Sequence, residues 1–111
     1  MIRGKLPMEV FTKEALLIDI LDTICTKLNI HSSAFVFLSR SYSDNEIQSL
    51  YSYFVRIEHS KKSLSTDEVI SKIQEIKPDT SSQTAEATIH ELIAAFQDEE
   101  RFPWIISQLK L

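Results

Sequence analysis

The stretch from residue 11 to residue 30 constrains the fold of this chain most, because its apolar residues follow a helical period. Steps of four, three and four residues separate the central members, which places them on one side of a helix. Three further apolar residues widen this stripe to about half of the helix circumference. A helix that is apolar over so wide an arc buries itself against more than one neighbour, so we expect the other helices to pack around it. The stripe comprises Leu16, Leu17, Ile18, Ile20, Leu21, Ile24 and Leu28.

Composition extends the helical prediction to the whole chain. A sequence of 111 residues, 43% of them apolar, has room for one domain with one modest core. Folds rich in tight turns need many turn-forming residues, and this sequence has 1 Gly and 3 Pro. We therefore predict an all-α protein, a compact bundle of five or six short helices with no sheet. Residues 1–10 are expected to form an N-terminal arm, and residues 11–111 a single helical domain.

Capping residues and breaks in the apolar period predict where the helices begin and end. Ser43 and Ser65 each stand three residues before a glutamate, which is the pattern of a capping box at a helix start. Pro78 closes the helix that Ser65 opens, and Pro103 fits the first turn of the last helix. The polar run 79–84 is predicted to be a loop. The expected helices span residues 12–29, 34–40, 43–59, 65–77, 85–97 and about 102–109.

The order of features from residue 34 onward resembles a small uncharacterised all-helical family of Gram-positive bacilli. In that family a short aromatic-aliphatic helix leads into a capped polar helix, a shorter capped helix and two C-terminal helices. This chain lacks the glycine that the family has in the connection at residues 98–101. The resemblance implies an all-helical fold and a soluble location. The segments that carry it are Phe35–Leu38, Ser43–Glu46, Leu64–Val69 and Ala87–Ile89.

The charge and the cysteine content of the sequence indicate which classes of partner the protein binds and in which cellular compartment it resides. The net charge of −4 makes nucleic acid an unlikely main partner for the domain. The single Cys25 excludes an internal disulfide and a cysteine-based zinc site, and it fits a reducing compartment. No segment approaches the ~20 apolar residues of a membrane span. The sequence therefore predicts a cytoplasmic protein with no membrane association.

No residue pattern in the chain indicates an enzyme. Glu86 and His90 stand one helical turn apart and could supply two metal ligands, but no third ligand is evident. A zinc-protease motif beginning at His90 would need a second histidine where Ala94 stands. Cys25 lies beside the apolar stripe in mid-helix, so we interpret it as a buried, inert core thiol. We predict no catalytic residues, no cofactor and no metal.

The remaining interpretation is a non-enzymatic protein-interaction module, a small adaptor or regulator that binds another protein or itself, with a homodimer as the expected form. Trp104 lies towards the rim of the last helix's apolar stripe, where a large aromatic residue often anchors an interface. The alternative for Trp104 is that it covers the domain's own core. The candidate interface residues are Leu17, Ile18, Phe102, Trp104 and Leu109.

The sequence is also compatible with two other functions. Residues 33–59 have the helix-turn-helix spacing of some DNA-binding regulators, although the second helix begins Asp44-Asn45-Glu46, whose carboxylates repel phosphate. A small metal-dependent enzyme is the third alternative, because Glu86 and His90 could begin a metal site.

Overall fold

The computed structural model describes residues 12–109, which form six α-helices and no strand, so the predicted all-α class is confirmed. The predicted arm at residues 1–10 lies outside the described residues. In chain order the helices are α1 (Lys13–Leu28), α2 (Ser33–Ser39), α3 (Asp44–Ser60), α4 (Thr66–Ile76), α5 (Ser82–Glu99) and α6 (Pro103–Leu109).

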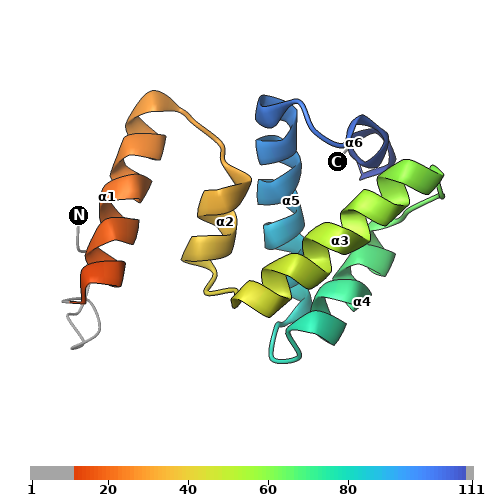
Figure 1. The fold of residues 1–111 in the computed structure, drawn as a ribbon, viewed down its shortest axis with the longest axis horizontal. Helices are drawn as coiled ribbons and strands as arrows, with labels where there is room; N and C mark the ends of the chain where they lie inside the picture. The colour runs from red at the N-terminus through yellow and green to blue at the C-terminus, as the bar shows by residue number, and fades with distance from the viewer. Residues whose placement is uncertain (1–11, 110–111) are drawn as a thin grey trace.

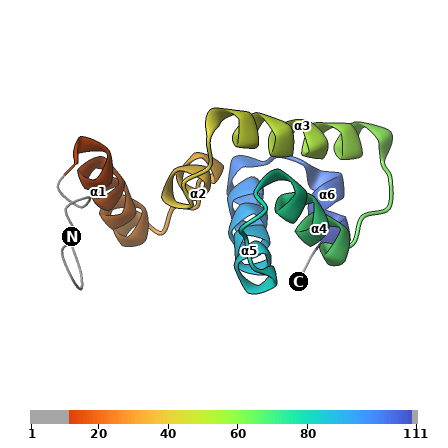
Figure 2. The same cartoon turned by 90° about the horizontal axis from the view of Figure 1, so that it is seen from below.

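Helix α5 forms the centre of the domain (Figures 1 and 2). Helices α2, α4 and α6 pack against α5, while α3 packs against α4 and α6. The large apolar residues on α5 are all but removed from solvent, and two of its alanines are fully buried. Its buried residues are Ala85, Thr88, Ile89, Leu92, Ile93, Ala95 and Phe96.

The expectation that the other helices pack around α1 is wrong. Helix α1 lies at one end of the elongated molecule, packs mainly against α2 and contains no buried residue (Figure 1). The physical reason is competition for the core. Because α5 carries apolar residues on the sides that face α2, α4 and α6, it already buries the surfaces that α1 was expected to cover.

An aromatic cluster joins three parts of the chain next to α5. The ring of Phe96 packs edge-on against Phe102 at a centroid distance of 4.8 Å and against Phe54 at 5.6 Å. Tyr51 packs edge-on against the outer side of Phe102 at 5.4 Å. Aromatic pairs in this geometry stabilise a core by more than the burial of their apolar area alone would provide. The cluster therefore ties α3 and the start of α6 to the end of α5.

The two predicted capping boxes are confirmed. The side-chain oxygens of Ser43 and Ser65 each accept a hydrogen bond from the backbone N–H of the glutamate three residues later, at 3.2 Å. In return, Glu46 and Glu68 each accept from the backbone N–H of the serine at 2.8 Å. Both serines have extended backbone angles, so α3 and α4 begin where the sequence predicts.

The predicted loop at residues 79–84 is wrong in its second half, because α5 begins at Ser82 rather than near Ala85. Ser81 is the N-cap, and its hydroxyl accepts from the backbone N–H of Thr84 at 3.1 Å. The side chain of Gln74 donates to the carbonyl of Thr80 at 3.2 Å, which ties this helix start to α4. A polar run without apolar period thus conceals a well-capped helix start.

We predict that Ser43→Ala and Ser65→Ala each lower the free energy of unfolding by about 0.5–2 kcal/mol, because each leaves a backbone N–H at a helix start without its partner. Urea denaturation followed by circular dichroism measures the loss. Ser71→Ala, an exposed residue inside α4, is the matched control and should leave stability unchanged or slightly raised. Equal effects at Ser65 and Ser71 would contradict the capping role.

Tyr42 is buried at the corner between α2 and α3, with an exposed fraction of 8%. Among the described residues its hydroxyl has no hydrogen-bond partner. Burial raises the pKa of this phenol, with Arg40 acting against the shift and Glu46 in favour of it. The buried hydroxyl therefore carries a desolvation cost that nothing described here offsets.

We predict that Tyr42→Phe leaves the free energy of unfolding unchanged or raises it by up to about 1 kcal/mol, because it removes an unpaired polar group. The control is Tyr51→Phe, which removes a hydroxyl that accepts a hydrogen bond from Arg101 and should destabilise the fold slightly. A loss at position 42 larger than that at position 51 would show that the Tyr42 hydroxyl has a partner in solution.

Candidate functional site

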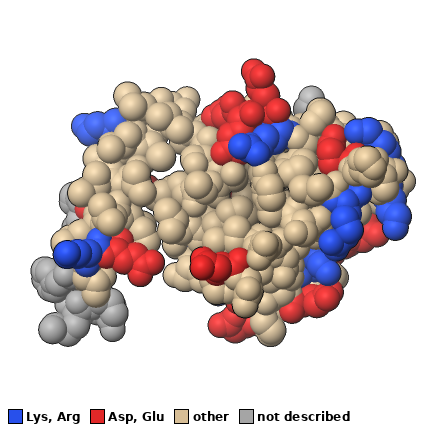
Figure 3. Space-filling model, in the orientation of Figure 1, with Lys and Arg blue, Asp and Glu red and all other residues tan. Residues whose placement is uncertain are grey.

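The most unusual surface of the molecule is an exposed apolar face on α1. We call it the α1 face. Each of its residues has between 38% and 65% of its surface exposed to solvent. On the side drawn in Figure 3, the surface over α1 is uncharged along most of its length, with charged atoms gathered near the helix ends. The α1 face consists of Leu16, Leu17, Ile20, Leu21, Ile24 and Leu28.

Local interactions define both ends of α1. The hydroxyl of Thr12 accepts from the backbone N–H of Ala15 at 3.1 Å, which makes Thr12 the N-cap as predicted. Asn29 adopts the left-handed conformation with φ 55°, and the N–H of Ile30 donates to the carbonyl of Cys25 at 2.9 Å. This arrangement ends a helix by satisfying its last carbonyl groups. Helix α1 is therefore a complete, capped helix although little of it is covered.

Acidic residues near the end of α5 hold the joint between α1 and α2. Asp98 accepts from the backbone N–H of His31 at 3.3 Å, and its carboxylate lies 2.8 Å from Nδ1 of the same residue. Glu99 accepts from the backbone N–H and the hydroxyl of Ser33, both at 2.9 Å. These contacts fix the point from which α1 leaves the domain.

A third contact secures α2 itself. The guanidinium group of Arg40 donates two hydrogen bonds to the carboxylate of Glu91 on α5, at 2.9 and 2.8 Å. The hydrogen bond with Glu91 is the main cause that raises the pKa of Arg40. Such a two-point contact fixes orientation as well as distance. Helix α2 is held on α5, and one side of α1 packs on α2. The opposite side of α1 therefore faces away from the domain.

The structure places the two predicted interface residues of α1 on different sides of the helix. Leu17 belongs to the α1 face and is 59% exposed. Ile18 is partly buried on the side that packs on α2, where it lines a hollow of about 360 Å³ with Leu38 and Tyr42. Leu17 is therefore available to a partner, and Ile18 is largely occupied inside the molecule.

The other three candidates lie at the opposite end of the molecule, around α6, so the structure does not bring the five residues into one surface (Figures 1 and 2). Phe102 packs in the aromatic cluster beside α5. Leu109 is 1% exposed and forms part of the core. Trp104 is half-buried, and its indole N–H donates to the carbonyl of Lys62 at 2.7 Å.

Glu58 of α3 attaches α6 beside Trp104. Its two carboxylate oxygens accept from the backbone N–H groups of Trp104 and Ile105, each at 3.0 Å. Burial acts to raise the pKa of Glu58, but these two hydrogen bonds, together with Lys61 at 3.2 Å, outweigh it and lower the pKa. The charged carboxylate is thus the form that stabilises the start of α6.

We predict that Glu58→Gln lowers the free energy of unfolding at pH 7 by about 1–3 kcal/mol, because it weakens hydrogen bonds made by a charged group. Since the pKa of Glu58 is lowered by folding, its contribution is full above the ordinary glutamate range and is lost as pH falls through the lowered pKa. The difference in the free energy of unfolding between the wild type and the variant should therefore be smaller when urea denaturation is repeated near pH 3.

The matched control is Glu75→Gln, because Glu75 lies in an exposed ion pair with Lys72 at 3.4 Å. This substitution should change stability by less than about 1 kcal/mol. A Glu58 effect that stays constant between the two pH values would contradict the assigned role of its charge.

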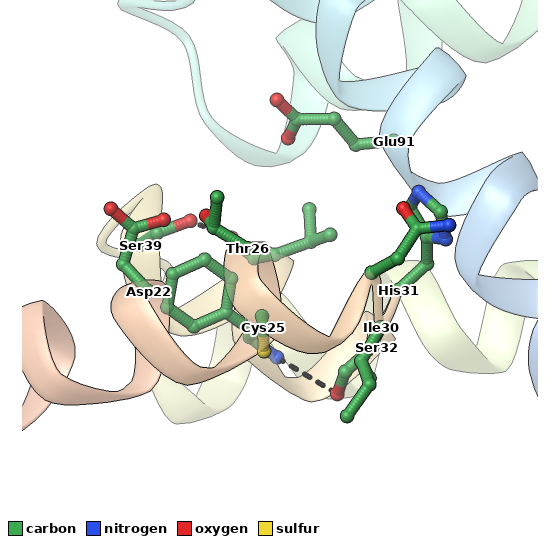
Figure 4. Close-up of a pocket in the computed structure, with 11 residues that line it drawn as sticks. Asp22, Cys25, Thr26, Ile30, His31, Ser32, Ser39 and Glu91 are labelled. Atoms are coloured by element: carbon green, nitrogen blue, oxygen red, sulfur yellow. Dashed lines mark hydrogen bonds between the residues drawn. The ribbon is translucent and has the colours of Figure 1, made fainter.

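A pocket of about 330 Å³ lies between α1, α2 and α5. Glu91 reaches toward it from α5, opposite Asp22, Cys25 and Thr26 of α1 (Figure 4). The interpretation of Cys25 as a buried core thiol is wrong, since the residue is partly exposed and lines this pocket. Cys25 lacks deep burial because α1 has one main neighbour rather than several.

Two of the polar groups at the pocket, Glu91 and His31, are used in structural contacts. The carboxylate of Glu91 binds Arg40, and the ring of His31 is bonded to Asp98. Across residues 12–109, no three His, Cys, Asp or Glu side chains are grouped closely enough to hold a metal ion. Glu86 and His90 are exposed on the outer side of α5.

The helix-turn-helix alternative can also be placed on the structure. The first turn of α3 carries Asp44 and Glu46, and Glu46 is engaged in its capping box and lies 3.9 Å from Lys77. The basic residues Arg56, Lys61 and Lys62 lie in the last turns of α3 or just beyond it. The end of α3 that would enter a DNA groove is thus its acidic end.

The chain matches no protein-family model, no curated protein and no solved structure. The resemblance to a helical family of Gram-positive bacilli therefore stays a prediction. None of the described helices is long and apolar enough to cross a membrane.

The sequence reveals the residues of the α1 face and offers Leu17 as an interface candidate, but the stripe as a whole was expected to be buried against other helices of the domain. Four residues of the face recur at strict intervals of four, and that signal fits an inner or an outer surface equally. Sequence reasoning missed Asp98 and Glu99 as the residues that hold the α1–α2 joint. Their partners stand more than sixty positions away in the chain, so no local pattern links them.

Proposed function

We propose that this protein is a non-enzymatic interaction module, a small cytoplasmic adaptor or regulator that binds protein through the α1 face. The observation that carries the proposal is a capped helix with six exposed Leu and Ile residues, projecting from a domain that holds its base in place. Exposed apolar side chains scattered over a surface need no explanation, but a continuous apolar stripe indicates a binding surface.

The size of the stripe supports this function. Six Leu and Ile residues that are about half exposed present on the order of 600 Å² of apolar surface, the upper end of what a single soluble monomer usually shows. The surface lies on one helix, so a partner can cover it with a single helix or groove. Helical recognition of this kind uses apolar residues spaced three and four apart.

The charges of α1 favour a protein partner over a membrane surface. Helices that lie on membranes carry basic residues on their polar side and are attracted to anionic lipids. Helix α1 has three acidic residues, Glu14, Asp19 and Asp22, against two basic residues, Lys13 and Lys27. Its net negative charge opposes binding to an anionic bilayer. The partner with the required chemistry is an apolar protein surface.

Site-specific photo-cross-linking in the native host tests this function. A photo-activated residue is placed at Ile24 of the α1 face or, as the matched control, at Val55 of α3, and both positions are 45% exposed. We expect discrete covalent adducts from position 24 and few from position 55, because a partner covers α1. Mass spectrometry of the adducts identifies the proteins bound.

The same experiment can overturn the proposal. If positions 24 and 55 give the same weak, diffuse adducts, then α1 is an unoccupied surface and the interaction function is wrong. Circular dichroism of each purified variant confirms that the helices remain formed.

A further inference from the structure

We propose that the partner of the α1 face is the α1 face of a second copy of this chain, with the two helices antiparallel about a two-fold axis. This inference rests on the proposed function and names its partner. The structure supplies three arguments: the order of residues along the face, the direction of the charges, and the area available.

The main row of residues on the α1 face reads the same in both directions. Residues 16, 20, 24 and 28 form a ridge with the order Leu, Ile, Ile, Leu. With the two-fold axis level with residue 22 along the helix, but on the exposed side, Leu16 lies against Leu28 of the second copy and Ile20 against Ile24. Ridges of residues four apart are also those that pack in the commonest class of helix pair. The face is therefore complementary to itself, as a two-fold contact requires.

The positions of the charged residues favour an antiparallel pair over a parallel one. Lys13 lies at the N-terminal end of the face and Lys27 near its C-terminal end. A parallel pair would set each lysine beside its own counterpart, whereas an antiparallel pair sets Lys27 beside the apolar Leu17. There the lysine stem packs on leucine and the ammonium group reaches solvent. Antiparallel helices also oppose their dipoles, so each positive helix end lies near a negative one.

The exposed area of the α1 face is large enough for a two-fold contact. A stable interface of ordinary size buries about 800 Å² on each partner. The α1 face supplies on the order of 600 Å² of apolar surface, and the adjoining Ile30, which is 44% exposed, and the stems of the two lysines extend it. The surface thus reaches the size of a modest two-fold interface without any contribution from the rest of the domain. Helix α1, peripheral in one chain, becomes central in the pair.

Sedimentation equilibrium of the full chain from micromolar to hundreds of micromolar is the first test. The mass should rise from the 12.8 kDa of one chain towards twice that value. Ile24→Lys should weaken the association by about 30-fold or more, because it buries a charge at the centre of the contact. Val55→Lys, made at an equally exposed residue of α3, should associate as wild type does.

The second test reads the direction of the helices. In a Cys25→Ala background, Leu16→Cys and Leu28→Cys chains of different mass are mixed and treated with a short thiol cross-linker. Antiparallel packing joins the two different chains to each other. Parallel packing joins like chains, because positions 16 and 28 are then separated by about 18 Å along the helix.

Each of the following outcomes overturns the inference: a mass that stays at one chain at every concentration, a dimer that Val55→Lys weakens as much as Ile24→Lys, or predominant cross-linking of like chains. Thermal unfolding of each variant shows whether a lost dimer reflects a lost fold. In that case Ile24→Ser, which adds no charge, replaces Ile24→Lys and must still weaken the association.

The inference and the function can fail separately. A monomeric chain whose position 24 forms adducts with other proteins in the cell keeps the interaction function and removes the self-pairing. A chain without adducts at position 24 loses both.

Discussion

The burial of α5 is the constraint on which the rest of this structure depends. Its apolar residues face α2, α4 and α6, and Phe96 at its end is fully buried against Phe54 and Phe102. Once these neighbours surround α5, the single core of a chain this size is complete. Helix α1 is then left with α2 as its main neighbour, although it carries a stripe of Leu and Ile residues. The exposed α1 face is thus a consequence of how the core is filled.

The two shortest helices depend on acidic side chains supplied by other parts of the chain. Helices α2 and α6 have seven residues each, too few for a helix to be stable by itself. Glu99 binds the backbone N–H at the first residue of α2, and Glu58 binds two N–H groups in the first turn of α6. Negative charge at these positions also suits the helix dipole. Part of the acidic character of the chain therefore serves the fold.

This use of the carboxylates bears on function as well. Glu91 and His31 line the same pocket as the partly exposed Cys25, yet Glu91 is bonded to Arg40 and His31 to Asp98. Their contacts hold α2 and the α1–α2 joint against α5 rather than converging on a ligand. These contacts hold the C-terminal end of α1 in place on the domain. An apolar helix held at its base fits the protein-interaction function proposed above, because a preset shape lowers the cost of binding.

Local sequence patterns predict the helical class, both capping boxes and the position of the apolar stripe on α1, because these features depend on residues within a few positions of one another. They do not predict the start of α5, where polar residues hide the Ser81 cap, or the neighbours of any helix. A stripe such as Leu17 to Leu28 records that a helix has an apolar side, but not what covers that side. That α5 fills the core, that Leu109 lies inside it and that α1 is exposed to solvent became evident only from the packing of the helices. The physical reason is that apolar burial is non-directional, so the choice among competing helices belongs to the packing of the whole chain.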